Sequence, residues 1–423
     1  MRSALVFTIC LFACAAFLRA EPVRIRTVGI HDPITPVTAR FLHRVMEDAA
    51  KQRDRLVLIE LDTPGGLDSS MREIVKDIFA SPVPVAVYVS PSGARAASAG
   101  AIICLASDIC AMAPGTNIGA AHPVSLGEKT DKTMETKVVN DAEAYVEGIA
   151  RKRGRDETLA RSMVRDSISL SADKALAGHV IDLIARDRAD LLRQLEGRRM
   201  SRDGRETVLQ LAGAEVVPAQ MGAGEQILNA ISNPNVAYVL MMLGMLGLFF
   251  ELSNPGVILP GVVGGISLIL AFFAFQTLPV NYAGVLLILL ALILFIAEIK
   301  IVSHGMLTIG GVIAMVLGSL MLFESPEPYL RVSWSVILVT VLATVLFFVI
   351  AVTKVMAVHR LRPATGREGL TDQEGLAESD IAPEGKVFVC GEYWDAWSDE
   401  PIAAGTRVTV EAVEGMRLKV KRI

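Results

Sequence analysis

Apolar residues concentrate in the second half of the chain, where five long runs are separated by short polar or turn-forming segments. The runs extend over Val236 to Phe250, Val257 to Thr277, Ala283 to Ala297, Met306 to Phe323 and Val332 to Val352. A helix needs roughly 20 apolar residues to cross a bilayer. The pattern therefore predicts a membrane domain over residues 222–358 with about five transmembrane helices, of which the first and third runs are short.

The charges around these runs predict an orientation. Lys354 and Arg360 follow the last run, whereas Glu324 and Glu327 lie in the loop before it. Basic residues are enriched in cytoplasmic loops. Five spans with the N-terminal half outside therefore place the C-terminus in the cytoplasm, while four spans with one re-entrant run would place it outside.

The N-terminus has the pattern of an export signal. Met1 and Arg2 are followed by an apolar stretch from Ala4 to Leu18, with a small residue just before Glu21. A charged start, an apolar stretch and a small residue are typical of a signal peptide. Residues 1–20 are predicted to be one, with an uncleaved anchor or lipidation at Cys14 as the alternatives.

Between the signal and the membrane domain, strand-like and helix-like patterns alternate. Leu56–Leu61 and Val85–Val89 are predicted strands, Ser69–Ala80 is a predicted helix, and a further helix begins at Ser98. This alternation is typical of an α/β layer with parallel strands. Residues 21–221 are predicted to form such a domain.

The tail, residues 359–423, has a different pattern. Short alternating runs occur at Lys386–Cys390, Arg407–Val410 and Arg417–Lys421, and glycines precede the last two. Closely spaced short strands suggest a small β-barrel.

The charge balance and the cysteines limit the possible ligands and sites. The chain has 41 basic and 45 acidic residues, and a net charge of -4 gives no reason to expect nucleic acid. Outside the signal, Cys104, Cys110 and Cys390 have no metal-ligand spacing. We therefore expect neither a zinc site nor a disulfide framework.

Ser98 is the candidate nucleophile. It lies among the small residues Ala97, Ala99 and Gly100, downstream of a strand-like run that ends in Gly65-Gly66. A serine attacks a carbonyl only if a base accepts its proton and hydrogen-bond donors stabilise the oxyanion. Small neighbours let a substrate carbonyl approach the backbone amides, so the two segments together suggest an active site.

These segments resemble those of the membrane-bound serine proteases of the NfeD (nodulation efficiency D) family, distant relatives of Clp protease and signal peptide peptidase A. The matching stretches are Asp62–Gly66, Ala96–Gly100, Met112–Ala120, Ile381–Gly385 and Gly391–Trp394. The resemblance covers essentially the full chain. It implies a Clp/crotonase-like α/β soluble domain, an α-helical multi-span membrane domain and a small all-β barrel similar to the OB fold.

The resemblance also implies roles for individual residues. Ser98 is the nucleophile, and the backbone amides of Gly66 and Ala99 are the oxyanion donors. Family members use a serine–lysine dyad, and a lysine accepts a proton only where its surroundings disfavour the charged form.

Several residues compete for the role of the base. The lysine candidates are Lys129, Lys132 and Lys137, and Lys137 is preferred because it precedes a helix-like run. In some family members the lysine lies further along, where this chain has Glu147. His122 is the competing base, because it follows the serine at about the position of the Clp protease histidine.

The predicted function is a membrane-anchored serine endopeptidase that cleaves hydrophobic protein segments through an acyl-enzyme. The family's association suggests a stomatin- or prohibitin-like membrane protein as substrate or partner, with no cofactor or metal, and a homo-oligomer is expected. The protease domain is predicted outside the cytoplasm. A crotonase-type acyl-CoA enzyme is disfavoured by export, and a non-catalytic membrane scaffold with a degenerate protease domain is the alternative.

Overall fold

The computed structural model describes residues 23–124, 131–202, 204–253, 256–276, 278–301, 303–325, 327–359 and 367–423. The predicted signal peptide and Lys129 lie outside these ranges. The chain forms two compact units. One comprises Met1–Leu290 and Ile313–Val341, and the other Ala291–Val312 and Leu342–Ile423.

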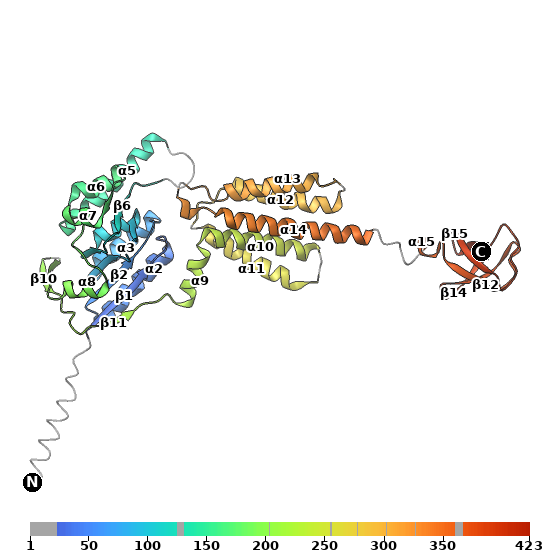
Figure 1. Ribbon diagram of the computed structural model, residues 1–423, viewed down its shortest axis with the longest axis horizontal. Helices are drawn as coiled ribbons and strands as arrows, with labels where there is room; N and C mark the ends of the chain where they lie inside the picture. The colour runs from blue at the N-terminus through green and yellow to red at the C-terminus, as the bar shows by residue number, and fades with distance from the viewer. Residues whose placement is uncertain are drawn as a thin grey trace, which may run out of the picture. The chain divides into compact units, whose positions relative to one another are not determined.

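The first unit contains a six-stranded sheet with the order β11-β1-β2-β3-β5-β8, in which all neighbouring strands are parallel (Figure 1). Its strands are β1 (Arg24–Ile30), β2 (Leu56–Leu61), β3 (Val85–Val89), β5 (Ile109–Met112), β8 (Leu183–Ile184) and β11 (Glu215–Pro218). Strands β2 and β3 have the predicted bounds. The expected α/β fold is confirmed.

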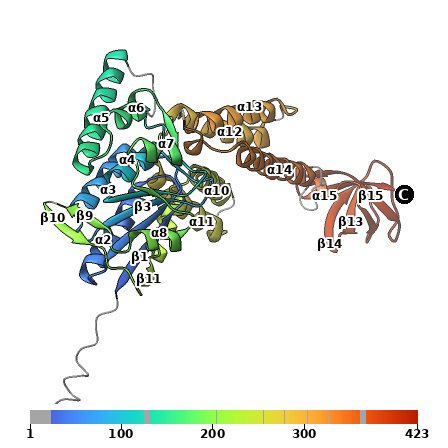
Figure 2. The ribbon, with the colours of Figure 1, turned by 60° about the vertical axis from the view of Figure 1, so that its left-hand side comes forward.

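Both faces of this sheet are covered, which explains why its strands are almost continuously apolar. Val57 and Ile59 belong to a core formed with α2 (Pro36–Lys51), α3 (Asp68–Ala80) and α4 (Ala99–Ala106). Leu56 and Leu58 point to the other face, where the core includes residues of α8 (Arg188–Leu195). Figure 2 shows α3 and α4 beside the sheet.

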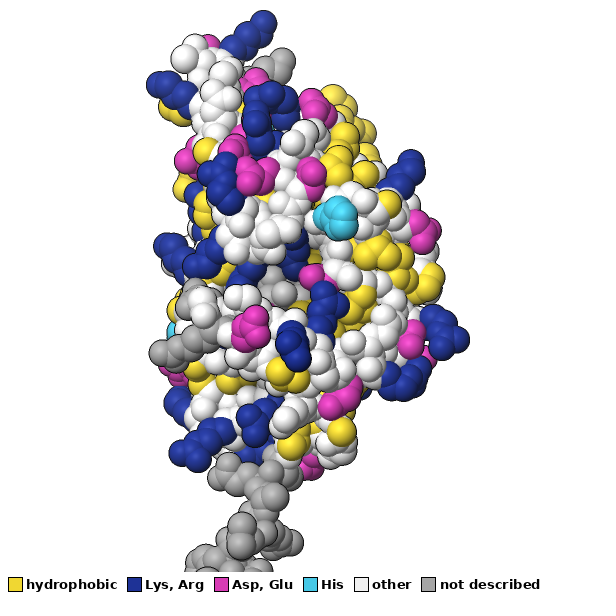
Figure 3. Space-filling view, turned by 90° about the vertical axis from the view of Figure 1, so that its left-hand side faces the viewer, with side chains coloured by type: hydrophobic (Ala, Val, Ile, Leu, Met, Phe, Trp, Pro, Cys, Tyr) yellow, Lys and Arg dark blue, Asp and Glu magenta, His cyan; other side chains and the backbone are white. Residues whose placement is uncertain are grey.

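Shorter elements complete the soluble part. A three-stranded sheet joins β4 (Arg95–Ala97), β6 (Asn117–Gly119) and β7 (Ser169–Ser171), and β9 (Arg199–Arg202) pairs with β10 (Arg205–Val208). The remaining helices are α5 (Lys132–Arg153), α6 (Glu157–Arg165), α7 (Ala172–Ala177) and α9 (Ala223–Ile231). The face drawn in Figure 3 carries interspersed basic and acidic side chains, and apolar side chains gather mainly on its right-hand side.

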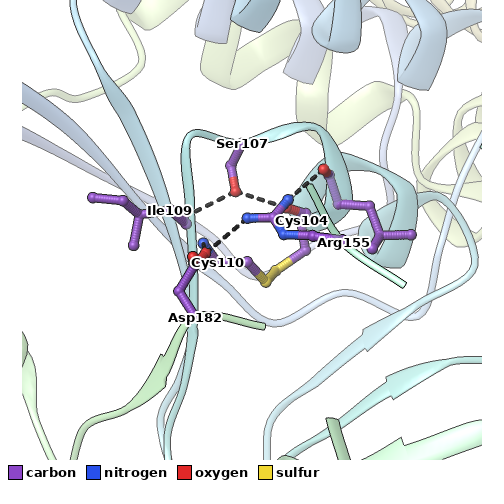
Figure 4. The surroundings of a disulfide bond; sticks show 7 residues. Cys104, Ser107, Ile109, Cys110, Arg155 and Asp182 are labelled. Atoms are coloured by element: carbon purple, nitrogen blue, oxygen red, sulfur yellow. Dashed lines mark hydrogen bonds and ion pairs between the residues drawn. A yellow bond between two sulfur atoms is a disulfide. The ribbon is translucent and has the colours of Figure 1, made fainter. Parts of the chain in front are cut away.

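A disulfide joins Cys104 and Cys110, although their spacing in the sequence implied no disulfide framework (Figure 4). Helix α4 ends at Ala106 and β5 begins at Ile109, so the short turn between them brings the two Cα atoms to 5.4 Å. The buried Arg155 donates to the carbonyl oxygen of Cys104 at 3.0 Å. The same oxygen also accepts from the Ser107 amide at 3.2 Å and from the Ser107 hydroxyl at 2.6 Å, so this backbone acceptor at the end of the helix has several donors.

Each of the five apolar runs forms a helix: α10 (Pro234–Ser253), α11 (Ile258–Phe275), α12 (Tyr282–Lys300), α13 (Met306–Met321) and α14 (Trp334–His359). By length and composition, three described segments can cross a membrane, namely Pro234–Ser253, Ile258–Phe275 and Tyr282–Ile299. The first and third apolar runs are short in the sequence, and flanking residues extend both into helices long enough to cross.

Helices α10 and α11 pack at backbone distance. A Cβ atom on Gly247 would lie 2.6 Å from the carbonyl oxygen of Pro260 and 2.9 Å from the Cα of Gly264. Small residues at helix interfaces are a common basis of association in membranes, where apolar burial between helices gives little driving force.

In the second unit, the tail forms the predicted barrel, closed in the order β12-β13-β14-β16-β15. Its elements are α15 (Arg367–Leu370), β12 (Glu374–Ala377), β13 (Glu384–Val389), β14 (Glu392–Trp397), β15 (Arg407–Glu414) and β16 (Arg417–Arg422). Val387, Val408 and Val410 fill its core, and Trp394 packs against that core.

Candidate active site

Ser98 occupies the turn between β4 and α4 in a conformation that few non-glycine residues adopt. Its backbone angles are φ 51° and ψ -118°. The turn is held at both sides, because the Ser98 amide donates to the Gly119 carbonyl oxygen at 2.9 Å and its own carbonyl accepts from Ala101 at 3.0 Å. Strained backbone of this kind clusters at functional sites, where the surrounding structure enforces it.

The small residues around Ser98 are required by the packing. A Cβ atom on Gly100 would lie 2.5 Å from the Cγ2 of Thr63. One on Gly65, which has a φ of 126°, would lie 2.8 Å from the Cβ of Ser98. The glycines at these positions thus allow the two segments singled out in the sequence to meet.

The Gly65-Gly66 segment is fixed against the chain before α2. Ile34 donates to the Gly65 carbonyl oxygen at 2.8 Å, and Leu67 donates to the Ile34 carbonyl oxygen at 2.9 Å. The Gly65 amide donates to the Thr63 hydroxyl at 3.2 Å. This pattern uses the amides on either side of Gly66 and leaves the Gly66 amide without an acceptor among the described residues.

Ala99 opens helix α4, and its amide also lacks an acceptor in the described part of the chain. Amides at a helix N-terminus carry partial positive charge that is suited to a developing oxyanion. The structure therefore brings Ser98 together with two segments that contain the predicted donors, Gly66 and Ala99.

A cavity of about 160 Å³ opens beside Ser98. Its lining combines mainly apolar residues of α3, α4 and α5 with the segment after β6, and includes Met71, Ile102, Ala121, Pro123, Val124 and Ala142. Two carboxylates, Asp68 and Glu327, also line the cavity, so it suits apolar or basic side chains of a peptide better than acidic ones.

His122 does not face this cavity, although its neighbours Ala121 and Pro123 line it. Its Nδ1 lies 2.9 Å from the carbonyl oxygen of Val164. Because a carbonyl oxygen only accepts, Nδ1 carries the proton in this contact. The half-buried imidazole is thus held by α6, and the structure does not bring it to Ser98.

Lys137 is exposed in the second turn of α5. Ala142, which lines the cavity, lies five positions later, so the two side chains point about 140° apart around the helix axis. Lys132 is exposed at the first residue of the same helix. Glu147 is paired with Arg151 at 2.7 Å.

Two features near the cavity were missed by sequence reasoning. Arg72 of α3 contacts Asp68 at 2.8 Å and Asp141 of α5 at 2.6 Å, which ties the two helices together beside the site. The i,i+4 spacing of Asp68 and Arg72 is visible in the sequence, but the contact with Asp141 is not. The second feature is the loop before α14, whose residues Glu327, Tyr329 and Leu330 reach the cavity.

Family comparisons cover nearly the whole chain. The model of the NfeD1b N-terminal domain matches residues 24–218, that of the NfeD integral membrane domain residues 235–353, and that of the NfeD-like C-terminal, partner-binding domain residues 367–422.

Similar proteins span the same length. The membrane-bound protease PH1510 of Pyrococcus horikoshii is 34% identical over 434 residues, which cover 100% of this chain and 98% of that protein. The membrane protein NfeD1b of Bacillus subtilis is 28% identical over 443 residues, covering 99% and 97%. A solved lysine-to-alanine variant of the 1510-N membrane-bound stomatin-specific protease, in complex with a substrate peptide, is 32% identical and covers 49% of this chain and 96% of its own, with a TM-score of 0.46. The chain is therefore a membrane protein that belongs to the NfeD family.

Proposed function

We propose that this chain is a membrane-anchored serine endopeptidase in which Ser98 is the nucleophile. The observation that carries the proposal is the strained turn at Ser98, which lies beside the Gly66 and Ala99 segments and opens into an apolar cavity. The relative that is 34% identical over the whole chain is a membrane-bound protease, which supports the same activity.

In the proposed reaction the Ser98 Oγ forms a bond to the peptide carbonyl carbon while a base takes the hydroxyl proton. The amides of Gly66 and Ala99 donate to the oxyanion of the tetrahedral intermediate. The C–N bond then breaks as the departing amine receives the proton from the base. Water attacks the acyl-enzyme in the same way and releases the acid product and free Ser98.

Lys137 is the base that we propose. No residue of α5 before Ala142 is buried or packs against the hydrophobic core, so the first turns of the helix contribute no side chain to it. Segments with few buried contacts change position at little free-energy cost. Substrate binding in the cavity can thus be accompanied by movement of Lys137 towards Ser98, whereas His122 would have to give up its bond to Val164.

The proposed substrate is an apolar segment of a membrane protein. The apolar lining beside Ser98 supports this choice. A solved relative is described as a stomatin-specific protease, and the model that matches the tail describes a partner-binding domain. We therefore propose a stomatin-like protein as substrate or partner, with the barrel as its docking module and a homo-oligomer as the working form.

The protease domain is proposed to lie outside the cytoplasm. Its disulfide between Cys104 and Cys110 supports this location, because disulfides persist mainly in oxidising compartments. The C-terminal barrel is proposed to be cytoplasmic, as the five apolar helices and the basic residues after α14 indicate.

Labelling with a fluorophosphonate tests the assignment. Purified full-length protein should react, and Ser98→Ala should abolish the labelling and the cleavage of apolar peptides. Ser69→Ala is the matched control, because Ser69 is an exposed serine in the first turn of α3. Labelling that persists in Ser98→Ala would remove Ser98 from the role, and a wild-type protein that neither labels nor cleaves would favour the membrane scaffold.

A further inference from the structure

The loop that leads into α14 contributes to the cavity beside Ser98. Glu327, Tyr329 and Leu330 line it together with Ser98 and Ala99. The last two belong to the 3₁₀ turn η1 (Pro328–Leu330). Part of the wall around the nucleophile therefore comes from the membrane domain rather than from the α/β domain.

Tyr329 lies next to the nucleophile. Its hydroxyl oxygen is 3.4 Å from the position that a Cβ atom on Gly65 would occupy, and the Ser98 Oγ is 3.3 Å from the same position. The phenol and the serine hydroxyl thus both lie within 3.4 Å of one point beside Gly65. A substrate carbonyl at Ser98 therefore lies in a cavity whose wall includes Tyr329.

The phenol is available for contact with a substrate. Tyr329 is half-buried, and its hydroxyl has no hydrogen-bond partner among the residues that the structure describes. Burial, aided by the charge of Glu327, raises the pKa of Tyr329 to about 12, although Arg95 opposes the shift. The phenol therefore remains neutral and keeps its proton at neutral pH.

A second cavity, of about 260 Å³, adjoins the first. It is lined by the segment before α2, by the junction of α9 and α10 and by Leu278. Gly66, Leu67, Tyr329 and Leu330 line both cavities. These four residues therefore lie between the space at Ser98 and a space beside the beginning of the membrane helices.

We propose that Tyr329 and Leu330 are specificity-determining residues, which limit the size of the substrate side chain next to the scissile bond. The peptide passes between them and Gly66-Leu67, so that one side of the scissile bond lies at Ser98 and the other in the larger cavity. This inference rests on the proposed protease activity. It adds that the membrane domain selects the cleavage position.

The test uses full-length protein in detergent and a peptide that the wild type cleaves. Variants of the peptide carry Ala, Leu or Trp at each position flanking the scissile bond. Tyr329→Ala should raise kcat/KM for the Trp peptide relative to the Ala peptide by about tenfold or more at one position. Tyr329→Phe keeps the ring and should keep the wild-type size preference.

Tyr282→Ala is the matched control, because Tyr282 lies at the start of α12 and its side chain is 79% exposed. It should leave both the preference and the rate unchanged. Fluorophosphonate labelling of each variant measures the fraction of the protein in which Ser98 is reactive. An unchanged size preference in a fully labelled Tyr329→Ala protein would overturn the specificity proposal alone, whereas absent labelling in the wild type would overturn the protease proposal and this inference with it.

Discussion

Replacing Gly65 by alanine should disable Ser98 without unfolding the domain. The added Cβ atom would lie 2.8 Å from the Cβ of Ser98. Carbon atoms pack best at about 3.5–4.0 Å, so Ser98 must retreat by roughly 1 Å. A misplacement of about 1 Å in a catalytic geometry costs about 10²-fold in rate, and we expect kcat to fall by at least that factor.

Gly115→Ala separates this effect from backbone strain. Gly115 also has a positive φ, of 77°, but a Cβ atom there would meet nothing within 4 Å. Both variants should lose about 1–3 kcal/mol of stability, because a side chain is strained at such angles. Only Gly65→Ala should lose peptide cleavage and fluorophosphonate reactivity. Equal kcat values for the two folded variants would refute the placement of Gly65 against the nucleophile.

Three further outcomes are expected. Lys137→Ala and Lys137→Arg should both reduce peptide cleavage about as much as Ser98→Ala, because alanine has no basic group and arginine keeps the charge without acting as a base. His122→Ala should reduce cleavage much less, and a fully active Lys137→Arg would exclude Lys137 as the base. Stability against denaturant should fall as pH rises from 10 to about 12, because burial raises the pKa of Tyr88 from 10.0 to about 12 and the unfolded chain therefore releases the phenol proton first. Tyr88→Phe should show a smaller fall in its unfolding midpoint over this range. Cys390 is free and exposed, so a membrane-impermeant maleimide should label it only after the cells are permeabilised. Cys390→Ser is the control, and labelling of Cys390 in intact cells would contradict a cytoplasmic barrel.

Local patterns were sufficient to predict much of the fold. Strands β2 and β3 are runs of apolar residues buried on both faces, and such runs end where the sheet ends. The helix that begins beside Ser98 was predicted, whereas the strained backbone at Ser98 itself was not. The closed barrel followed from alternating residues such as Val408 and Val410, which point inward together.

Contacts between distant segments were not predictable in this way. The disulfide depends on how tightly the chain turns after α4, which the separation of Cys104 and Cys110 does not reveal. The orientation of His122 depends on the Val164 carbonyl, which becomes available only because α6 ends beside the segment that follows β6. The sequence shows which chemical groups a side chain carries, but the orientation of the side chain depends on the residues that it contacts in the fold.

The loop before α14 illustrates the same limit for function. In the sequence, Glu327 is one of two acidic residues in an outer loop, and its neighbour Tyr329 has no distinguishing pattern. In the structure, Tyr329 lies within 3.4 Å of the point where a Gly65 side chain would begin, so the absence of that side chain leaves room for two hydroxyl groups. Gly65 thus serves both the nucleophile and the loop, and substitutions at Gly65 and at Tyr329 should be coupled. We expect that removing the Tyr329 ring lets Ser98 and the new methyl group of Gly65→Ala relax apart, so that the double variant recovers part of the lost kcat. If the two sites are independent, the effects of Gly65→Ala and Tyr329→Ala on kcat should simply multiply in the double variant.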